Sequence, residues 1–141
     1  MRVVIVGCGR VGAQLARLLL ADGHQVTVVD KDSASFGRLG SDFAGEVVLG
    51  TGIDEDVLLR AGIEEADAVV AVTSGDNTNV MAAQVAKEIF GVSKVICRVD
   101  DPLREEIYRT LGLETICATV WQANHIRESL EGRGSGGEPC M

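Results

Sequence analysis

The chain has 141 residues, the size of one domain, and 46% of them are hydrophobic, which is enough for a sizeable core. Its formal net charge of −8 argues against binding to nucleic acid or to an anionic membrane surface. Aromatic residues make up only 4% of the sequence, so the core must consist mainly of Val, Ile, Leu and Ala, which is typical of parallel strands buried on both faces. The apolar stretches are interrupted within about ten residues, far short of the roughly 20 that a membrane-spanning helix needs.

The first thirty residues predict a strand, a glycine-rich turn, a helix and a second strand. The apolar run Val3–Val6 leads into the sequence Gly-Cys-Gly-Arg-Val-Gly at 7–12, and a helical pattern follows over Arg10–Ala21. A second apolar run, Val26–Val29, ends on Asp30. A strand, a GxGxxG turn that opens a helix, and an acidic residue about 20 positions further on make up the fingerprint of a dinucleotide-binding site.

Each glycine of this turn has a predicted role. Gly7 lets the chain leave the strand sharply, because a residue without Cβ tolerates a positive φ. Gly9 leaves room for a pyrophosphate, and Gly12 permits close packing of the helix on the strands. Asp30 is predicted to accept hydrogen bonds from both ribose hydroxyls. Because its charge would repel a 2′-phosphate, NAD(H) or an adenine nucleotide is favoured over NADP(H). The alternative is a glycine-rich turn without a ligand.

The remainder of the chain continues the alternation of strands and helices. Further strands are expected at Glu46–Leu49, Ala68–Val72, Lys94–Val99 and Glu114–Cys117. Further helices are expected at Ser33–Leu39, Asp54–Ala61, Thr78–Phe90, Pro102–Leu111 and Val120–Leu130. With right-handed crossovers, this alternation predicts an α/β fold: a Rossmann-like, doubly wound six-stranded parallel sheet in the order 3-2-1-4-5-6, with helices on both faces. The domain is expected to cover residues 1–130, followed by a flexible Gly-rich tail at 131–141.

Helical spacing also predicts which helix faces are buried. In the first helix the predicted buried stripe consists of Val11, Leu15, Leu18 and Leu19. In the helix at 78–90 it consists of Val80, Met81, Val85 and Ile89, with Ala82, Ala83 and Ala86 widening the apolar surface.

In open α/β sheets, ligands bind outside the carboxyl ends of the strands, where the strand order reverses. The candidate ligand-binding residues belong to the turn and to the strand ends: Gly7, Cys8, Gly9, Arg10, Val11, Gly12, Asp30, Lys31, Thr51, Gly52, Thr73 and Arg98. Thr51 and Gly52 are expected near the adenine, and Thr73 near the ribose or the phosphates.

Two arginines are candidates for holding phosphate charge, because a guanidinium group suits bidentate contacts. Arg10 lies within the glycine turn, and Arg98 at the end of the fifth strand. For Arg98 the alternative is an ordinary salt bridge with Asp100 or Asp101.

The four cysteines, at positions 8, 97, 117 and 140, form no CxxC pair, which favours reduced thiols in a cytosolic protein. Cys8 is expected to be a small residue that fits the turn; the alternative is a redox sensor beside the nucleotide. No catalytic residue and no metal ligand are assigned.

Four stretches of the sequence resemble the nucleotide-binding N-terminal domain of TrkA-type potassium-uptake regulators, also called the RCK N-terminal or KTN domain. They are VVIVGCGRVGAQLARLL, VVDKD, the segment from LGTGIDEDV to RVDDP, and YRTLGLETICATVWQANHI. The third is the most specific, because ordinary dehydrogenases lack its AD-A-VV-A-VT--DNTN pattern. The similarity extends from Met1 to about Leu130.

This resemblance implies a ligand-binding regulator rather than a catalyst. Members of the family bind NAD(H), ATP, ADP or AMP at the glycine turn, at Asp30, around Gly50 and at Thr73. Their subunits form dimers and octameric rings beneath a membrane potassium channel or transporter, on the cytoplasmic side, and ligand exchange gates ion flux. Many members also carry a second, C-terminal ligand-binding domain. Many have an aspartate where this chain has Thr51, so the choice among NAD, AMP and ATP stays open.

The resemblance also concerns the last helix, which commonly crosses to a neighbouring subunit in this family. Trp121, Ile126 and Leu130 would then be interface residues. The alternative is that these side chains pack on their own subunit.

Two other functions are possible for a Rossmann-like domain. An NAD-dependent oxidoreductase needs a catalytic group beside the nicotinamide, but His24 is expected at the amino end of the second strand and His125 on the last helix. A bare scaffold for a protein partner is disfavoured by the intact glycine turn and by Asp30.

Overall fold

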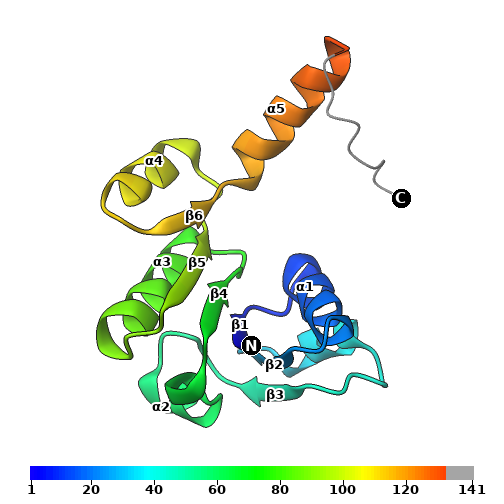
Figure 1. Cartoon of the computed structure of the whole chain (residues 1–141), viewed down its shortest axis with the longest axis vertical. Coiled ribbons are helices and arrows are strands. Elements are labelled where there is room, and N and C mark those ends of the chain that lie inside the picture. The colour runs from blue at the N-terminus through cyan, green and yellow to red at the C-terminus, as the bar shows by residue number, and fades with distance from the viewer. Residues whose placement is uncertain (133–141) are drawn as a thin grey trace.

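A computed structural model of the chain describes residues 1–132. Six parallel strands form one sheet in the order β3-β2-β1-β4-β5-β6, which confirms the predicted topology (Figure 1). The strands are β1 Arg2–Val6, β2 Gln25–Asp30, β3 Glu46–Leu49, β4 Ala68–Ala71, β5 Lys94–Arg98 and β6 Glu114–Ile116. The α-helices are α1 Arg10–Ala21, α2 Glu55–Arg60, α3 Asp76–Gln84, α4 Pro102–Thr110 and α5 Ala118–Leu130. Residues 133–141, most of the predicted tail, lie outside the described residues.

Three shorter helical segments complete the fold. Two are 3-10 helices, η1 Ser33–Leu39 and η2 Ile63–Glu65, and one is a π-helix, η3 Val85–Ile89. The expected helix at 33–39 is therefore of the tighter 3-10 type. The expected helix at 78–90 begins two residues earlier, at Asp76, and changes to π geometry in its second half.

Two hydrophobic clusters cover opposite faces of the sheet. Successive side chains of a strand point to opposite faces, so Val3 and Ile5 join one cluster while Val4 and Val6 join the other. α1 and η1 pack on the first face, and α2, η2 and α3 on the second. Burial on both faces explains why the strands appear in the sequence as continuous apolar runs.

The carboxyl ends of three central strands lie side by side. Val6, the last residue of β1, pairs with Val29 of β2 and with Ala71 of β4. The chain order reverses between β1 and β4, so this edge is the topological switch point of the sheet. The segments that leave these strands, including the glycine turn, therefore meet at one place.

The predicted buried face of α1 is wrong in part. Val11 and Leu18 are 51% and 54% exposed, whereas the buried residues of α1 are Gly12, Ala13 and Ala16. The helix lies so close to the glycine turn that only small side chains fit between it and the sheet. Of the predicted stripe, Leu15 and Leu19 are partly buried and pack at the edge of the cluster.

The predicted stripe in the helix at 78–90 is also corrected. Val80 is buried and Val85 partly buried, but Met81 is 48% and Ile89 56% exposed. Ala82, Ala83 and Ala86, which were expected to widen the apolar surface, are all buried. Phe90 donates its N–H to the carbonyl of Val85, an i→i+5 bond that belongs to the π geometry of the second half of this helix.

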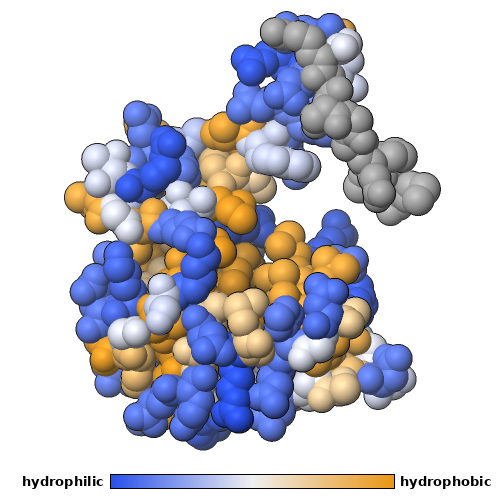
Figure 2. All heavy atoms as spheres, in the orientation of Figure 1, coloured by the Kyte–Doolittle hydropathy of each residue, from blue (hydrophilic) through white to orange (hydrophobic). Residues whose placement is uncertain are grey.

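The two C-terminal helices leave apolar side chains exposed. α5 stands away from the sheet in Figure 1 and contains no buried residue. Trp121, Ile126 and Leu130 are 65%, 59% and 83% exposed, so packing on their own subunit, the alternative considered for them, is not observed. Figure 2 shows hydrophobic residues at the surface near α1 and where α5 leaves the sheet. Within residues 1–132 no helix is both long enough and apolar enough to cross a membrane.

Candidate functional site

The glycine turn begins where β1 meets the end of β4. Gly7 has a φ of +113°, and its N–H donates to the carbonyl of Val29 over 2.8 Å. A Cβ on Gly7 would lie 2.8 Å from the backbone nitrogen of Thr73. The turn therefore rests directly on the backbone that follows β4, and only glycine fits there.

The other two glycines differ in their surroundings. Gly9 is the N-cap of α1, and a Cβ there would meet no atom within 4 Å, so its outer side is open. A Cβ on Gly12 would lie 1.9 Å from the carbonyl oxygen of Gly7. Helix and turn thus touch through backbone atoms, the arrangement predicted for this motif.

The N-terminus of α1 is free to receive an anion. Within residues 1–132, no side chain caps it by a hydrogen bond, and its first turn carries no acidic residue. Unpaired N–H groups and the positive end of the helix dipole favour a negative group at such a position. Arg10 and Val11, both exposed, stand in this first turn.

Asp30 connects the end of β2 to the glycine turn. One carboxylate oxygen accepts the N–H of Cys8 over 2.7 Å, and the other accepts the N–H of Asp32 over 2.8 Å. Each carboxylate oxygen has two lone pairs, so both keep the capacity to accept a further hydrogen bond. Lys31, the next residue, is exposed.

Cys8 has the properties of a packing residue. Its side chain is fully buried, and the thiol donates to the carbonyl of Ser35 over 3.3 Å. Burial, and next the negative charge of Asp30, raise the pKa of the Cys8 thiol, while the charge of Arg38 opposes them. A redox sensor needs a lowered pKa, so the structure favours the small-residue interpretation.

Arg38 of η1 is a residue that the sequence reasoning missed. Its guanidinium donates to the carbonyl of Cys8 over 3.3 Å, and its own carbonyl accepts a hydrogen bond from Arg17 of α1. No spacing rule connects an arginine in a short helix with the turn thirty residues earlier, so the sequence carried no signal for this contact.

The loop after β3 approaches the same edge. Gly50 donates its N–H to the carbonyl of Asp30 over 2.9 Å. Gly52 is buried, and a Cβ there would lie 2.2 Å from Cγ1 of Val6. Thr51, between them, is partly buried, and its hydroxyl accepts the N–H of Ile53 over 3.5 Å. Thr51 and Gly52 thus lie beside the ends of β1 and β2.

Thr73 follows β4, and its polar groups are held by the protein. Its N–H and its hydroxyl both donate to Oδ1 of Asn79, over 2.8 and 2.7 Å. Nδ2 of Asn79 donates to the carbonyls of Thr73 and Arg98, over 3.0 and 2.9 Å. Thr73 therefore has no free donor for a ligand. In the sequence, Asn79 stands out only as the last residue of the DNTN pattern.

Arg98 forms the salt bridge considered as its alternative role. Its guanidinium makes a bidentate pair with Asp100, with Nε–Oδ1 2.9 Å and Nη2–Oδ2 2.8 Å. Asp76, the first residue of α3, accepts the backbone N–H groups of Asp100 and Asp101 over 2.8 and 3.1 Å. Asp76 and Arg98 thus brace the loop between β5 and α4.

Neither histidine lies at the edge where β1, β2 and β4 end. Nδ1 of His24 is 3.1 Å from the N-terminal nitrogen of Met1, beside the amino ends of the strands. His125 lies on α5, stacked on Trp121 with ring centroids 5.3 Å apart. Within residues 1–132 no group of three or more His, Cys, Asp or Glu side chains could hold a metal ion.

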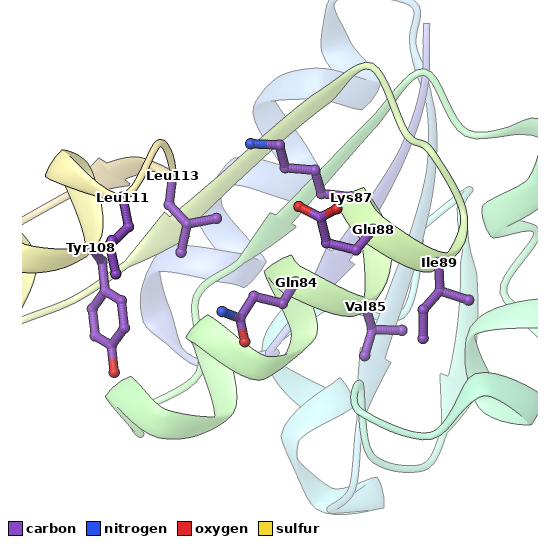
Figure 3. A pocket seen from close by; sticks show the side chains of 8 residues that line it. All are labelled: Gln84, Val85, Lys87, Glu88, Ile89, Tyr108, Leu111 and Leu113. Atoms are coloured by element: carbon purple, nitrogen blue, oxygen red, sulfur yellow. The ribbon is translucent and has the colours of Figure 1, made fainter.

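Two surface cavities lie away from the glycine turn. A surface cavity of about 380 Å³ lies between η3 and α4, lined among others by Val85, Ile89, Tyr108 and Leu113 (Figure 3). A second cavity of about 470 Å³ lies at the amino ends of the strands. The turn is an open edge that presents backbone groups, as sites for phosphates do.

Comparison with known proteins identifies close relatives. Residues 3–119 match the family model described as the TrkA-N domain. The chain is 51% identical over 139 residues to the Trk system potassium uptake protein TrkA of Streptomyces coelicolor, covering 99% of this chain and 61% of the relative. It is 35% identical over 130 residues to the TrkA homolog of Methanothermobacter thermautotrophicus, covering 92% of this chain and 60% of the relative. The chain thus spans about three fifths of the length of these relatives.

Solved structures with the same fold share less of the sequence. The AMP-bound Kef CTD of Shewanella denitrificans superimposes with a TM-score of 0.78 at 23% identity, covering 96% of this chain and 84% of that chain. GsuK bound to ADP superimposes with a TM-score of 0.78 at 20% identity, covering 94% of this chain and 34% of that chain. The GsuK channel bound to NAD superimposes with a TM-score of 0.69 at 22% identity, covering 82% of this chain and 21% of that chain.

Proposed function

The chain belongs to the TrkA-N domain family, and we propose that it is a regulatory, nucleotide-binding part of a potassium uptake system. In this proposal a nucleotide binds at the glycine turn, and its exchange changes the conformation that the domain imposes on a membrane transporter. The relatives named as Trk system potassium uptake proteins support the transport role.

One observation carries the proposal of a nucleotide site. The uncapped N-terminus of α1, the open side of Gly9 and the carboxylate of Asp30 meet at the switch point of the sheet. A helix N-terminus favours a phosphate, and a carboxylate at the end of the second strand suits the ribose hydroxyls. No other edge of the described sheet combines these three features.

The proposed ligand is NAD(H) or an adenine nucleotide, that is AMP, ADP or ATP. Structures of the same fold are named as bound to AMP, ADP and NAD, which supports this class of ligand. The phosphates would lie against the 7–12 turn, with Arg10 beside them, and the ribose against Asp30. The adenine would lie toward Lys31, Thr51 and Gly52. Thr73 would contribute acceptor groups only.

We assign no catalytic step to this site. Beside the backbone N–H groups of the turn lie the Asp30 carboxylate and a Cys8 thiol that is buried and has a raised pKa. Neither histidine lies beside the carboxyl edge of the sheet, so within residues 1–132 no imidazole is placed there to exchange a proton with a substrate. The nucleotide would then act as a signal.

The proposed partners are a membrane potassium channel or transporter and further copies of this chain. The domain would lie in the cytoplasm, where its membrane partner would hold it at the inner face of the membrane. Dimers and octameric rings are the assemblies that the family resemblance implies, and α5 is the element proposed to cross between subunits. Its large apolar side chains Trp121, Ile126 and Leu130 are all exposed, which supports a role in contacts with another subunit.

Nucleotide binding is expected to raise the thermal stability of the domain. At 100 times its dissociation constant, a ligand that binds only the folded state stabilises it by about 2.7 kcal/mol. Differential scanning fluorimetry and calorimetric titration with NAD, NADH, AMP, ADP and ATP measure this effect, and NADP is the matched control because Asp30 repels its 2′-phosphate. Absence of stabilisation by all five ligands would contradict the proposed function.

Self-association through α5 is expected to depend on Trp121. Trp121→Glu removes a 65% exposed indole without touching either core cluster, so the monomer should fold normally while the assembly dissociates. Light scattering after size exclusion reads the mass, and Gln122→Glu on the exposed neighbour serves as the charge-matched control. A wild-type chain that stays monomeric at high concentration would rule out this interface.

A further inference from the structure

Asn79 is the most unusual polar residue of the described chain. Within residues 1–132 it is the polar side chain that is completely buried, with 0% exposure. Its amide makes four hydrogen bonds: Oδ1 accepts from the N–H and the hydroxyl of Thr73, and Nδ2 donates to the carbonyls of Thr73 and Arg98. The amide oxygen has two lone pairs and the amide nitrogen two hydrogens, so each is matched.

These bonds fix one short segment of backbone. Asn79 holds Thr73 at its N–H, its carbonyl and its hydroxyl, and Gly75 adds a bond from its N–H to the same hydroxyl over 3.2 Å. The bond to the carbonyl of Arg98 joins this segment to the end of β5. A buried network in which every group is satisfied is rigid, and loss of one member leaves the others unpaired in a low-dielectric interior.

The fixed segment is the surface on which the glycine turn rests. The Cα of Gly7 lies so close to Thr73 that a Cβ would be 2.8 Å from its nitrogen and 2.9 Å from the carbonyl carbon of Val72. Beyond Gly7, the turn contacts α1 through the Gly7 carbonyl and Gly12. A displacement of Thr73 would therefore move the turn and the first N–H groups of α1.

We propose that Asn79 is a positioning residue of the nucleotide site, which acts through Thr73 to hold the glycine turn in the geometry that receives the phosphates. It does not touch the ligand. This inference rests on the proposed function, because the turn must bind a nucleotide for its geometry to matter. It places one supporting residue of the site on α3, an element outside the dinucleotide fingerprint.

α3 also supplies a matched control. Asp76, three residues before Asn79, holds the N–H groups of Asp100 and Asp101 in the loop between β5 and α4. Asp76→Ala therefore removes two side-chain hydrogen bonds from the same helix without releasing Thr73. Both Asn79→Ala and Asp76→Ala are expected to lower the unfolding temperature, whereas only Asn79→Ala changes the glycine turn.

The test compares AMP and NAD affinities of the two variants by calorimetry, at a temperature where both are folded. Asn79→Ala is expected to weaken both ligands by about 10- to 100-fold, the range seen when outer hydrogen-bond partners of metal ligands are removed. Asp76→Ala should keep the wild-type affinity. Equal affinity of wild type and Asn79→Ala would overturn the inference alone. A wild-type chain that binds neither ligand would overturn the proposed function, and this inference with it.

If Asn79→Ala does not fold, hydrogen exchange on the wild-type chain tests the role of Asn79 instead. AMP is expected to slow exchange of the Thr73 N–H and of the Asn79 side-chain amide, which hold the turn. The Asp101 N–H, bonded to Asp76, should exchange at an unchanged rate. Equal rates at Thr73 with and without bound AMP would overturn the inference.

Discussion

Gly12→Ala is expected to destabilise the domain by at least about 3 kcal/mol, the upper range for overpacking in a tight interior. A Cβ at position 12 would lie 1.9 Å from the carbonyl oxygen of Gly7 and 3.0 Å from its carbonyl carbon. Both are backbone atoms, so no side-chain rotation relieves the clash. α1 would have to move away from the sheet and open the cluster that contains Ala13 and Ala16.

Urea unfolding followed by circular dichroism measures the loss, which corresponds to a fall of roughly 10 °C in Tm for a domain of this size. Gly9→Ala is the control within the same turn, because a Cβ there meets no atom within 4 Å and φ is −80°. Its free energy of unfolding should stay within about 0.5 kcal/mol of wild type. Nucleotide affinity should still fall, since the new methyl group occupies the open side of the turn. A Gly12→Ala chain as stable as wild type would contradict the close approach of α1 to the turn.

Asp30→Ala is expected to weaken nucleotide binding strongly. A hydrogen bond to a charged group contributes about 1.5–3 kcal/mol, so loss of one ribose contact weakens binding by at least about tenfold. The substitution also releases the N–H of Cys8, which Asp30 holds over 2.7 Å, so the glycine turn loses support together with its ribose acceptor. The discrimination against NADP should shrink as well, because the repelling charge is gone.

Titration calorimetry with AMP, NAD and NADP checks this result. Asp32→Ala is the matched control: its carboxylate caps η1 through the N–H of Ala34 over 3.0 Å and has no contact with the turn. Asp30→Asn removes the charge and keeps the shape, since the amide oxygen can still accept hydrogen bonds. Unchanged affinity of Asp30→Ala for AMP and NAD would exclude Asp30 as the ribose acceptor.

The two wrong helix faces show where sequence reasoning stops. Periodicity places Val11 and Leu18 on an apolar stripe, because it ranks residues by hydropathy. The structure instead buries Gly12, Ala13 and Ala16, because α1 approaches the turn to backbone contact and side-chain size decides which face fits. In the second case the helix changes to π geometry over Val85–Ile89, with an i→i+5 hydrogen bond at Phe90 that no residue type in the sequence indicates.

The candidate site was likewise predictable from the sequence only in part. Spacing along the chain placed Gly7 and Asp30, since a strand, a tight turn and a helix follow one another within a single βαβ unit. The choice between two roles for Arg98 needed the position of Asp100, and the place of Asn79 needed the juxtaposition of α3 with the ends of β4 and β5. These contacts join residues of different elements, whose relative placement is not encoded in local spacing.

The sequence by itself determined the strand order, the parallel sheet and the glycine turn, because these follow from local rules: alternation of elements, right-handed crossovers and the conformational freedom of glycine. Only the tertiary structure decided which helix faces are buried, that Arg98 pairs with Asp100, and that the buried amide of Asn79 supports the turn through Thr73. Those outcomes depend on distances between segments far apart in the chain, where a difference of one ångström decides whether two groups bond or clash.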